Sequence, residues 1–212
     1  RVMATCHSLV QIEGPDSEVI GDPLEKASLE AVGWTYSADV ARGPAKVSAT
    51  IIQRHHFNSN LKRMSVVARV QDAQGGVTFE LAMKGAPEVV KQFLVDAPSN
   101  YDALYKQYAA QGARVIALAR RHLGGEVMDV LALKGQPRAE MEQGLTWVGF
   151  AIFSCPLKED SEPALAALRA SNHQLVMITG DAPLTACFAA SKVHIVTRAV
   201  LVLGHAAEEK GQ

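Results

Sequence analysis

Residues with the chemistry to hold a phosphate group follow an apolar run in the last quarter of the chain. In Met177-Ile178-Thr179-Gly180-Asp181 the run ends in a hydroxyl, a glycine and a carboxylate. A turn between a buried strand and a helix leaves backbone N–H groups and a helix N-terminus open to anions. Thr179, Gly180 and Asp181 are therefore the candidate catalytic residues, able to hold a phosphoryl group and to orient a nucleotide, a water or a metal ion. An ordinary turn with Thr179 and Asp181 as helix caps explains the same residues.

A second set of candidates combines an aromatic ring with cations. The ring of Phe57 could stack on a purine, and Lys62 after it could neutralise phosphates. Lys84 ends an apolar run and could reach a base or a phosphate, while Gly85 would permit close backbone approach by a planar ligand. The alternatives are an edge-strand core residue for Phe57 and solvated lysines at the other positions.

Two further charged residues fit a nucleotide site. Glu25, on a helix opened by Asp22 and Pro23, could accept from an exocyclic amine, or be a plain surface residue. Arg114, after a glycine, could bind a phosphate bidentately, or pair with a surface carboxylate. The adjacent histidines 55 and 56 would point to opposite faces of a strand, so one metal ion cannot bind both, and no metal ligands are assigned.

Composition limits the class of protein. The chain has 212 residues, is 48% hydrophobic and 20% charged, and has a net charge of −1 with the two signs interspersed. It can bury a substantial core, and it has no basic patch that would indicate nucleic acid as a partner. No apolar run reaches the length needed to cross a bilayer, so this segment is expected to be soluble. Its three widely spaced cysteines favour reduced thiols and a cytosol-facing location.

The elements that must position these residues fall into two patterns. The first part of the chain has the pattern of an antiparallel sheet, with a hairpin joining two of its strands and with helices around it. The second part has the strand-helix-strand-helix order that is typical of a parallel sheet. The first part has predicted strands at 9–12, 49–53, 64–70, 77–83 and 115–119, helices at 23–32, 87–94 and 101–111, and a turn at 13–17. The second part has predicted strands at 148–153 and 175–178 and helices at 161–170 and 183–191. The sequence predicts a domain boundary between 147 and 148.

Together these motifs carry a family resemblance. Gly21-Asp22-Pro23-Leu24-Glu25, Phe57 with the following basic pair, Lys84-Gly85-Ala86-Pro87-Glu88 and Thr179-Gly180-Asp181 stand in the order found in the cytosolic region of P-type ATPases. The longer strings, including Cys155-Pro156-Leu157-Lys158, are most similar to type-five, subgroup-A members of the endoplasmic reticulum membrane. The resemblance covers nearly the whole chain.

The resemblance implies a fold and a set of roles. Residues 1–147 would be an α+β nucleotide-binding domain, an antiparallel sheet flanked by helices, and residues 148–212 an incomplete α/β Rossmann-like, haloacid dehalogenase-like part of the phosphorylation domain. ATP would be bound with Phe57 on adenine, Glu25 and Lys62 near the base, Lys84 and Gly85 lining the pocket, and Arg114 toward the phosphates. Mg²⁺ would be the metal cofactor, with most of its ligands outside this segment.

The same resemblance implies partners and a mechanism for the full-length protein. The partners would be the actuator, phosphorylation and transmembrane domains of the same ATPase. ATP would phosphorylate an aspartate, and domain rotation would extract misinserted transmembrane helices from the endoplasmic reticulum membrane; manganese or other cation transport is the alternative. The chain has no Asp-Lys-Thr-Gly-Thr motif, so it is not expected to turn over alone.

Two other classes remain open from the sequence. A soluble hydrolase of the haloacid dehalogenase type would need its own nucleophilic aspartate, and no Asp-x-Asp or Asp-Lys-Thr-Gly stands in the chain. A noncatalytic regulatory module could keep the fold without ATP affinity. The aromatic and basic candidates argue against that module, and binding data decide the question.

Overall fold

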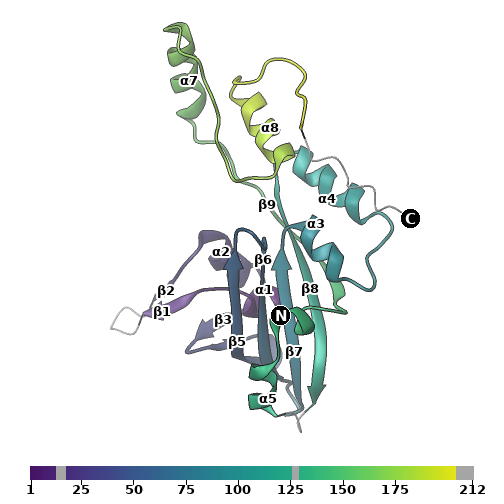
Figure 1. Ribbon diagram of the computed structural model, residues 1–212. Coiled ribbons are helices and arrows are strands. Elements are labelled where there is room, and N and C mark those ends of the chain that lie inside the picture. Colours follow the sequence, from purple (N-terminus) through teal and green to yellow (C-terminus); the bar gives the residue numbers. More distant parts are fainter. Residues whose placement is uncertain (13–17, 126–128, 204–212) are drawn as a thin grey trace, which may run out of the picture. The chain divides into compact units, whose positions relative to one another are not determined.

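The structure is a computed structural model that describes residues 1–12, 18–125 and 129–203. Its chain divides into two compact units (Figure 1). Unit 1 consists of Arg1–Asp102 and Val115–Ala151, and unit 2 consists of Ala103–Arg114 and Ile152–Gln212. The turn expected at 13–17 lies outside the described residues, and the predicted boundary between 147 and 148 remains a prediction.

Unit 1 is built on a seven-stranded sheet in the order β3-β4-β5-β6-β7-β8-β9. Neighbouring strands from β3 to β8 pair antiparallel, which confirms the antiparallel part of the predicted fold. The strands are β3 (Thr35–Ser37), β4 (Val40–Arg42), β5 (Ser48–Asn58), β6 (Arg63–Gln71), β7 (Val77–Gly85), β8 (Arg114–Gly125) and β9 (Thr146–Phe153). A separate hairpin pairs β1 (Val10–Ile12) with β2 (Glu18–Ile20).

Short helices surround this sheet. They are α1 (Val2–Thr5), α2 (Pro23–Ala31), η1 (Pro44–Lys46), α3 (Pro87–Val90), η2 (Lys91–Phe93), α5 (Val130–Gly135) and α6 (Arg138–Met141). The helix expected at 87–94 is thus an α-helical turn followed by a 3₁₀ turn. Helix α2 begins as its sequence predicts, because the Asp22 side chain accepts from the N–H groups of Leu24 and Glu25 and Pro23 occupies the first turn.

The central strands are covered on both faces, because consecutive side chains of a strand point to opposite sides of the sheet. Along β6, Met64 accepts from the Ser8 hydroxyl near α1, while Ser65 donates to Glu142 just after α6. Consecutive residues of a strand point to opposite faces, so α1 and α6 cover opposite faces of the sheet. Val66, Val67, Leu81 and Met83 are fully buried in this core.

Unit 2 contains helices α7 (Ser161–Ala170) and α8 (Pro183–Lys192), and most of α4 (Tyr101–Ala110). Both α7 and α8 were predicted. The predicted strand 175–178 is wrong: residues 173–179 pair with no strand among the described residues, and Ile178 is 95% exposed. An isolated extended segment cannot satisfy its backbone groups by a ladder, so its apolar sequence alone does not make it a strand. The Rossmann-like interpretation of this part is therefore not confirmed.

Candidate functional site

The predicted nucleotide-binding residues of unit 1 meet at one end of the sheet. β6 pairs with β7 so that Met64 lies opposite Lys84 and Arg63 opposite Gly85. Lys62, in the turn before β6, therefore lies beside the end of β7. β5 pairs with the same end of β6 through Asn58 and Arg63. The register of three strands thus brings together Phe57, Lys62, Lys84 and Gly85, which the sequence separates.

Glu25 reaches this end of the sheet from the first turn of α2. Its Oε1 accepts from Lys84 Nζ at 2.6 Å, and both side chains are largely buried. Its Oε2 accepts from the Ser8 backbone N–H at 2.9 Å. The carboxylate is therefore fixed between a cation and a backbone donor, and it presents acceptor oxygens to any ligand that enters.

Phe57 and Lys62 differ from the buried pair in their exposure. The Phe57 side chain is 62% exposed at the end of β5, and Lys62 is exposed in the following turn. An aromatic face open to solvent next to an ammonium group can take part in stacking and phosphate binding. This end of the sheet therefore carries a ring, two cations and a carboxylate.

The close approach at Gly85 involves the protein itself. A Cβ atom placed on Gly85 would lie 2.6 Å from the Lys62 carbonyl oxygen and 2.8 Å from the Arg63 Cβ. Only glycine therefore fits at this position while the Lys62 turn keeps its place. The structure gives a packing reason for Gly85, and its role toward a ligand remains a prediction.

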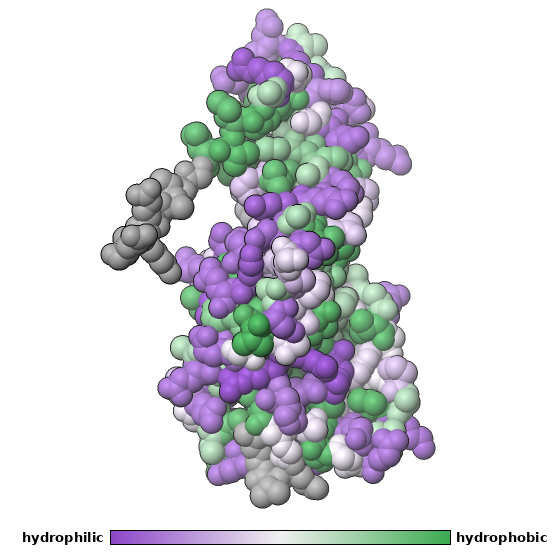
Figure 2. Space-filling model, turned by 90° about the vertical axis from the view of Figure 1, so that its right-hand side faces the viewer, coloured by the Kyte–Doolittle hydropathy of each residue, from purple (hydrophilic) through white to green (hydrophobic). Residues whose placement is uncertain are grey.

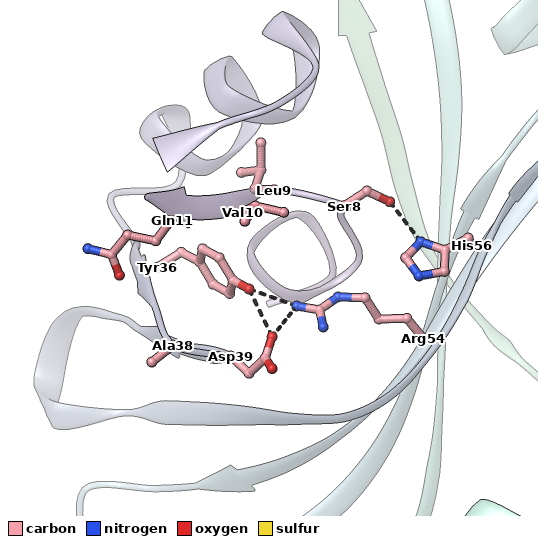
Figure 3. Close-up of a pocket in the computed structure, with 9 residues that line it drawn as sticks. All are labelled: Ser8, Leu9, Val10, Gln11, Tyr36, Ala38, Asp39, Arg54 and His56. Carbon is pink, nitrogen blue, oxygen red and sulfur yellow. Dashed lines mark hydrogen bonds and ion pairs between the residues drawn. The ribbon is translucent and has the colours of Figure 1, made fainter. Parts of the chain in front are cut away.

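A pocket of about 260 Å³ lies next to this group (Figure 3). On one side of it, Arg54 Nη2 donates to the Tyr36 hydroxyl at 2.8 Å and to Asp39 Oδ1 at 2.7 Å, while Tyr36 donates to Asp39 at 2.9 Å. The hydrogen bond from Arg54 lowers the pKa of Asp39. On the other side, the Ser8 hydroxyl bonds with His56 Nδ1 at 3.2 Å. The pocket's charged groups are thus paired with each other, and Ser8 joins it to the Glu25 carboxylate.

His7 fixes the backbone that carries the Ser8 donor. Its Nδ1 accepts from the Leu9 N–H at 3.2 Å and its Nε2 bonds with the Ala4 carbonyl at 3.0 Å, which assigns the proton to Nε2. Burial lowers the pKa of His7 to about 4. The neutral imidazole therefore braces the loop before β1 at physiological pH.

The candidate catalytic residues of unit 2 form a small network at the start of α8. Asp181 N donates to Thr179 Oγ1 at 3.1 Å, and the Thr179 hydroxyl donates to Asp181 Oδ2 at 3.3 Å. Arg114 is the first residue of β8, and it alone of that strand belongs to unit 2; it forms an ion pair with Asp181 Oδ1. Ala182 is the N-cap and Pro183 opens the helix as predicted. The two ends of this network, Thr179 and Arg114, are groups that can bind a phosphate.

A magnesium site depends on the ligands that the described residues can offer. Mg²⁺ takes an octahedron of oxygen ligands, some of them water or phosphate. In the parts of the chain that the structure describes, no three His, Cys, Asp or Glu side chains converge to hold a metal ion. A Mg²⁺ ion on a nucleotide is held by one or two carboxylates together with phosphate oxygens and water, so the carboxylate of Asp181 is a described group that fits such a role.

The sequence reasoning missed two contributors to the site. Ser8 contacts Glu25 through its backbone N–H, and no pattern of residue types predicts such a contact. Asn58 stands in the string Asn58-Ser59-Asn60, whose composition is typical of a turn, and its side chain bonds within that turn. The turn signal was available, but not its position beside Lys62 and Gly85.

Comparison with known proteins identifies the family of the chain. The family described as P-type ATPase, cytoplasmic domain N matches residues 1–93, the part that contains Glu25, Phe57, Lys62 and Lys84. The antiparallel sheet flanked by helices is consistent with this match, and together they define the class as cytoplasmic domain N of a P-type ATPase.

Relatives extend the match over nearly the whole chain. A probable manganese-transporting ATPase of Arabidopsis thaliana is 45% identical over 207 residues, covering 96% of the chain and 17% of the relative. Endoplasmic reticulum transmembrane helix translocases of Aspergillus fumigatus and Saccharomyces cerevisiae are 41% and 40% identical, covering 95% and 97% of the chain and 16% of each relative. The chain belongs to the P-type ATPases, in type-five subgroup A, and spans about a sixth of the length of these relatives.

Among the described residues, no helix is both long and apolar enough to cross a membrane.

Proposed function

We propose that unit 1 binds the adenine nucleotide of a type-five P-type ATPase. The observation that carries this proposal is the meeting of the Glu25–Lys84 pair with exposed Phe57 and Lys62 at one end of the sheet. Phe57 stacks on the base, and Glu25 accepts from the exocyclic amine of adenine. Lys62 and Lys84 offset negative charge at the base and phosphate ends of the ligand.

In this proposal unit 2 belongs to the Rossmann-like phosphorylation domain. Thr179 and the backbone around Gly180 hold the phosphoryl group that is transferred, Asp181 orients the nucleotide, and Arg114 binds the phosphates. The Arg114–Asp181 ion pair supports these roles because it keeps both side chains at the turn before α8. Mg²⁺ would shield the phosphate charge, with most of its ligands outside this chain.

The whole protein is proposed to couple this binding to transport at the endoplasmic reticulum membrane. An aspartate oxygen outside this chain attacks the γ-phosphorus of ATP, the bond to the β-phosphate oxygen breaks, and ADP leaves. Hydrolysis of the aspartyl-phosphate and domain rotation then extract a misinserted transmembrane helix. Support comes from the helix translocases of the two fungi, which match 95% or more of the chain.

Manganese transport is the second candidate for the whole protein. The Arabidopsis relative, named a probable manganese-transporting ATPase, is 45% identical to the chain. ATP hydrolysis by the full-length protein in vesicles, measured with added Mn²⁺ and separately with an apolar helical peptide, distinguishes the two. Stimulation by the peptide alone supports helix extraction, and stimulation by Mn²⁺ alone supports the cation transporter.

Nucleotide binding itself is tested by titrating the chain with ATP and following amide chemical shifts. We expect saturable shifts at Glu25, Phe57, Lys62 and Lys84, and their loss in Phe57→Ala and Lys84→Ala. Lys134→Ala is the matched control, because Lys134 is exposed on α5, toward the other end of the sheet (Figure 1). A folded chain without saturable shifts at millimolar ATP would favour the noncatalytic module.

A further inference from the structure

The turn between β5 and β6 places one residue in a backbone conformation that its side chain does not favour. Lys62 has φ of +48°, in the left-handed region that residues with a side chain seldom adopt. Such a conformation costs roughly 1 kcal/mol and persists only where neighbouring groups enforce it. The strained residue is also one of the candidate nucleotide contacts.

Asn58 is the first group that enforces this shape. Its side-chain Oδ1 accepts from the N–H groups of Asn60 at 2.8 Å and Leu61 at 3.3 Å. Its backbone carbonyl accepts from the Lys62 N–H at 2.7 Å. The side chain therefore ties down the middle of the turn, and the main chain closes it at Lys62.

Residues at the end of β7 and the start of α3 also hold Lys62 in this conformation. The Lys62 carbonyl accepts from the Ala86 N–H at 3.0 Å. That bond brings Lys62 so close to Gly85 that a Cβ atom there would lie 2.6 Å from the carbonyl oxygen. Gly85 thus permits a contact that the strained turn needs.

The strand before the turn is irregular at the candidate stacking residue. The pairing of β5 with β6 shifts register between His55 and Asn58, so Phe57 lies within the irregular stretch. Bulges of this kind change the direction in which a side chain points. Asn58 follows Phe57 directly, and the fixed turn therefore holds both Phe57 and Lys62.

We infer that Asn58 and Gly85 are positioning residues for the nucleotide site. They hold the 58–62 turn in its strained form before ligand arrives, so that the Phe57 ring and the Lys62 ammonium group are presented together to a purine nucleoside triphosphate. The inference rests on the proposed nucleotide-binding function. Pre-organisation of this kind strengthens binding because less chain has to be ordered when the ligand binds.

The test compares Asn58→Ala with Asn58→Asp. Alanine removes the acceptor for the Asn60 and Leu61 N–H groups, whereas aspartate keeps it. Because the added charge of aspartate repels phosphates, binding is measured with both ATP and uncharged adenosine. We expect Asn58→Ala to weaken the binding of both ligands about 5- to 10-fold, which is equivalent to about one lost hydrogen bond. Asn58→Asp is expected to bind adenosine as wild type does.

A second pair of variants tests the contact at β7. Gly85→Ala forces the Lys62 carbonyl away from its place. We expect this variant to weaken the binding of ATP at least as much as Asn58→Ala does. Gly125→Ala is the control on the neighbouring strand β8, because the nearest atom to a Cβ there is 3.9 Å away. If Gly85→Ala does not fold, the two Asn58 variants still decide the question.

A readout beyond stability separates positioning from general folding. In the full-length ATPase, Asn58→Ala is expected to raise the KM for ATP with kcat unchanged, and aspartate to restore adenosine binding in the chain. Folded Asn58→Ala and Gly85→Ala proteins that bind ATP as tightly as wild type would overturn the inference alone. A wild-type chain without saturable ATP binding would overturn the proposed function, and the inference with it.

Discussion

Apolar runs in the two units have similar composition and opposite environments. In β6 of unit 1, Val66 and Val67 are fully buried between two paired strands. In unit 2, Val176 and Ile178 are 73% and 95% exposed in an extended segment without strand pairing among the described residues. An apolar, β-branched sequence therefore becomes a strand only where neighbouring segments satisfy its backbone and cover its side chains.

Further exposed apolar residues follow the same rule. Leu201 and Leu203, near the end of the described chain, are 91% and 94% exposed. A patch of hydrophobic surface is visible in the upper part of Figure 2. Unit 1 has exposed apolar residues too, notably Phe57, but its strands bury most of theirs. Unit 2 therefore gains less free energy from hydrophobic burial per residue than unit 1 does.

Amide hydrogen exchange gives the largest contrast between the units. We expect the free energy of opening at residues 175–178 to be lower than that of the central strand β6 by at least about 3 kcal/mol, because exposed amides without a ladder exchange freely. The measurement is native-state exchange followed by NMR. Equal protection of 175–178 and β6 would contradict the comparison.

A matched pair of leucines measures the same contrast by mutation. Leu81→Ala removes a fully buried side chain of β7 and is expected to lower the free energy of unfolding by about 3 kcal/mol. Leu201→Ala removes a side chain that is 91% exposed, so a change below about 0.5 kcal/mol is expected. Urea denaturation of both variants checks the prediction, and comparable losses would show that Leu201 is buried in solution.

Ion pairs also differ between the units in how deeply they are buried. Glu142 of unit 1 is fully buried and accepts from Arg63 and Arg138 at 2.8 Å and from Ser65 at 2.6 Å. Burial alone would raise the pKa of Glu142, but the hydrogen bonds from Ser65 and the two arginines lower it below its usual value. Its stabilising effect is therefore present above the usual glutamate pKa and is lost as the pH falls through the lowered pKa.

Glu142→Gln is accordingly expected to cost about 3 kcal/mol of stability, because it leaves two arginines without their counter-charge. The control is Asp181→Asn in unit 2, where the pair with Arg114 is part-exposed and a change below about 1 kcal/mol is expected. Denaturation at neutral pH measures both. A small effect of Glu142→Gln would mean that water reaches this network.

The smallest expected effect concerns the pH dependence of unit 1. The folded pKa of His7 is lowered to about 4 by burial, so the unfolded chain binds the proton first as the pH falls below about 6.5. Stability is therefore complete at neutral pH and falls between about pH 6.5 and 4, by roughly 2–3 kcal/mol from this group.

Unfolding midpoints measured across this pH range test the prediction. His7→Gln, which keeps a side-chain donor toward the Ala4 carbonyl, is expected to flatten the profile by about one proton. His122→Gln is the control, because His122 is exposed on β8. An unchanged profile in His7→Gln would show that the pKa of His7 is the same in the folded and the unfolded chain.

Features that depend only on residues close together in the chain could be predicted from the sequence. Asp22 and Pro23 predicted the start of α2, and Pro183 predicted the start of α8, because capping residues act within one turn of a helix. The hairpin of β6 and β7 followed from its apolar strands and the glycine-containing turn between them. Four ordered motifs were also sufficient to indicate the family.

Features that join residues distant in the chain became known only from the folded structure. The Glu25–Lys84 pair, the buried contacts of Glu142 and the crowding of Gly85 against Lys62 each link different elements. Strand pairing decided that β5 extends to Asn58 and that residues 175–178 form no strand. A local pattern states what a segment can form, and the free energy of pairing and burial with distant partners selects what it does form.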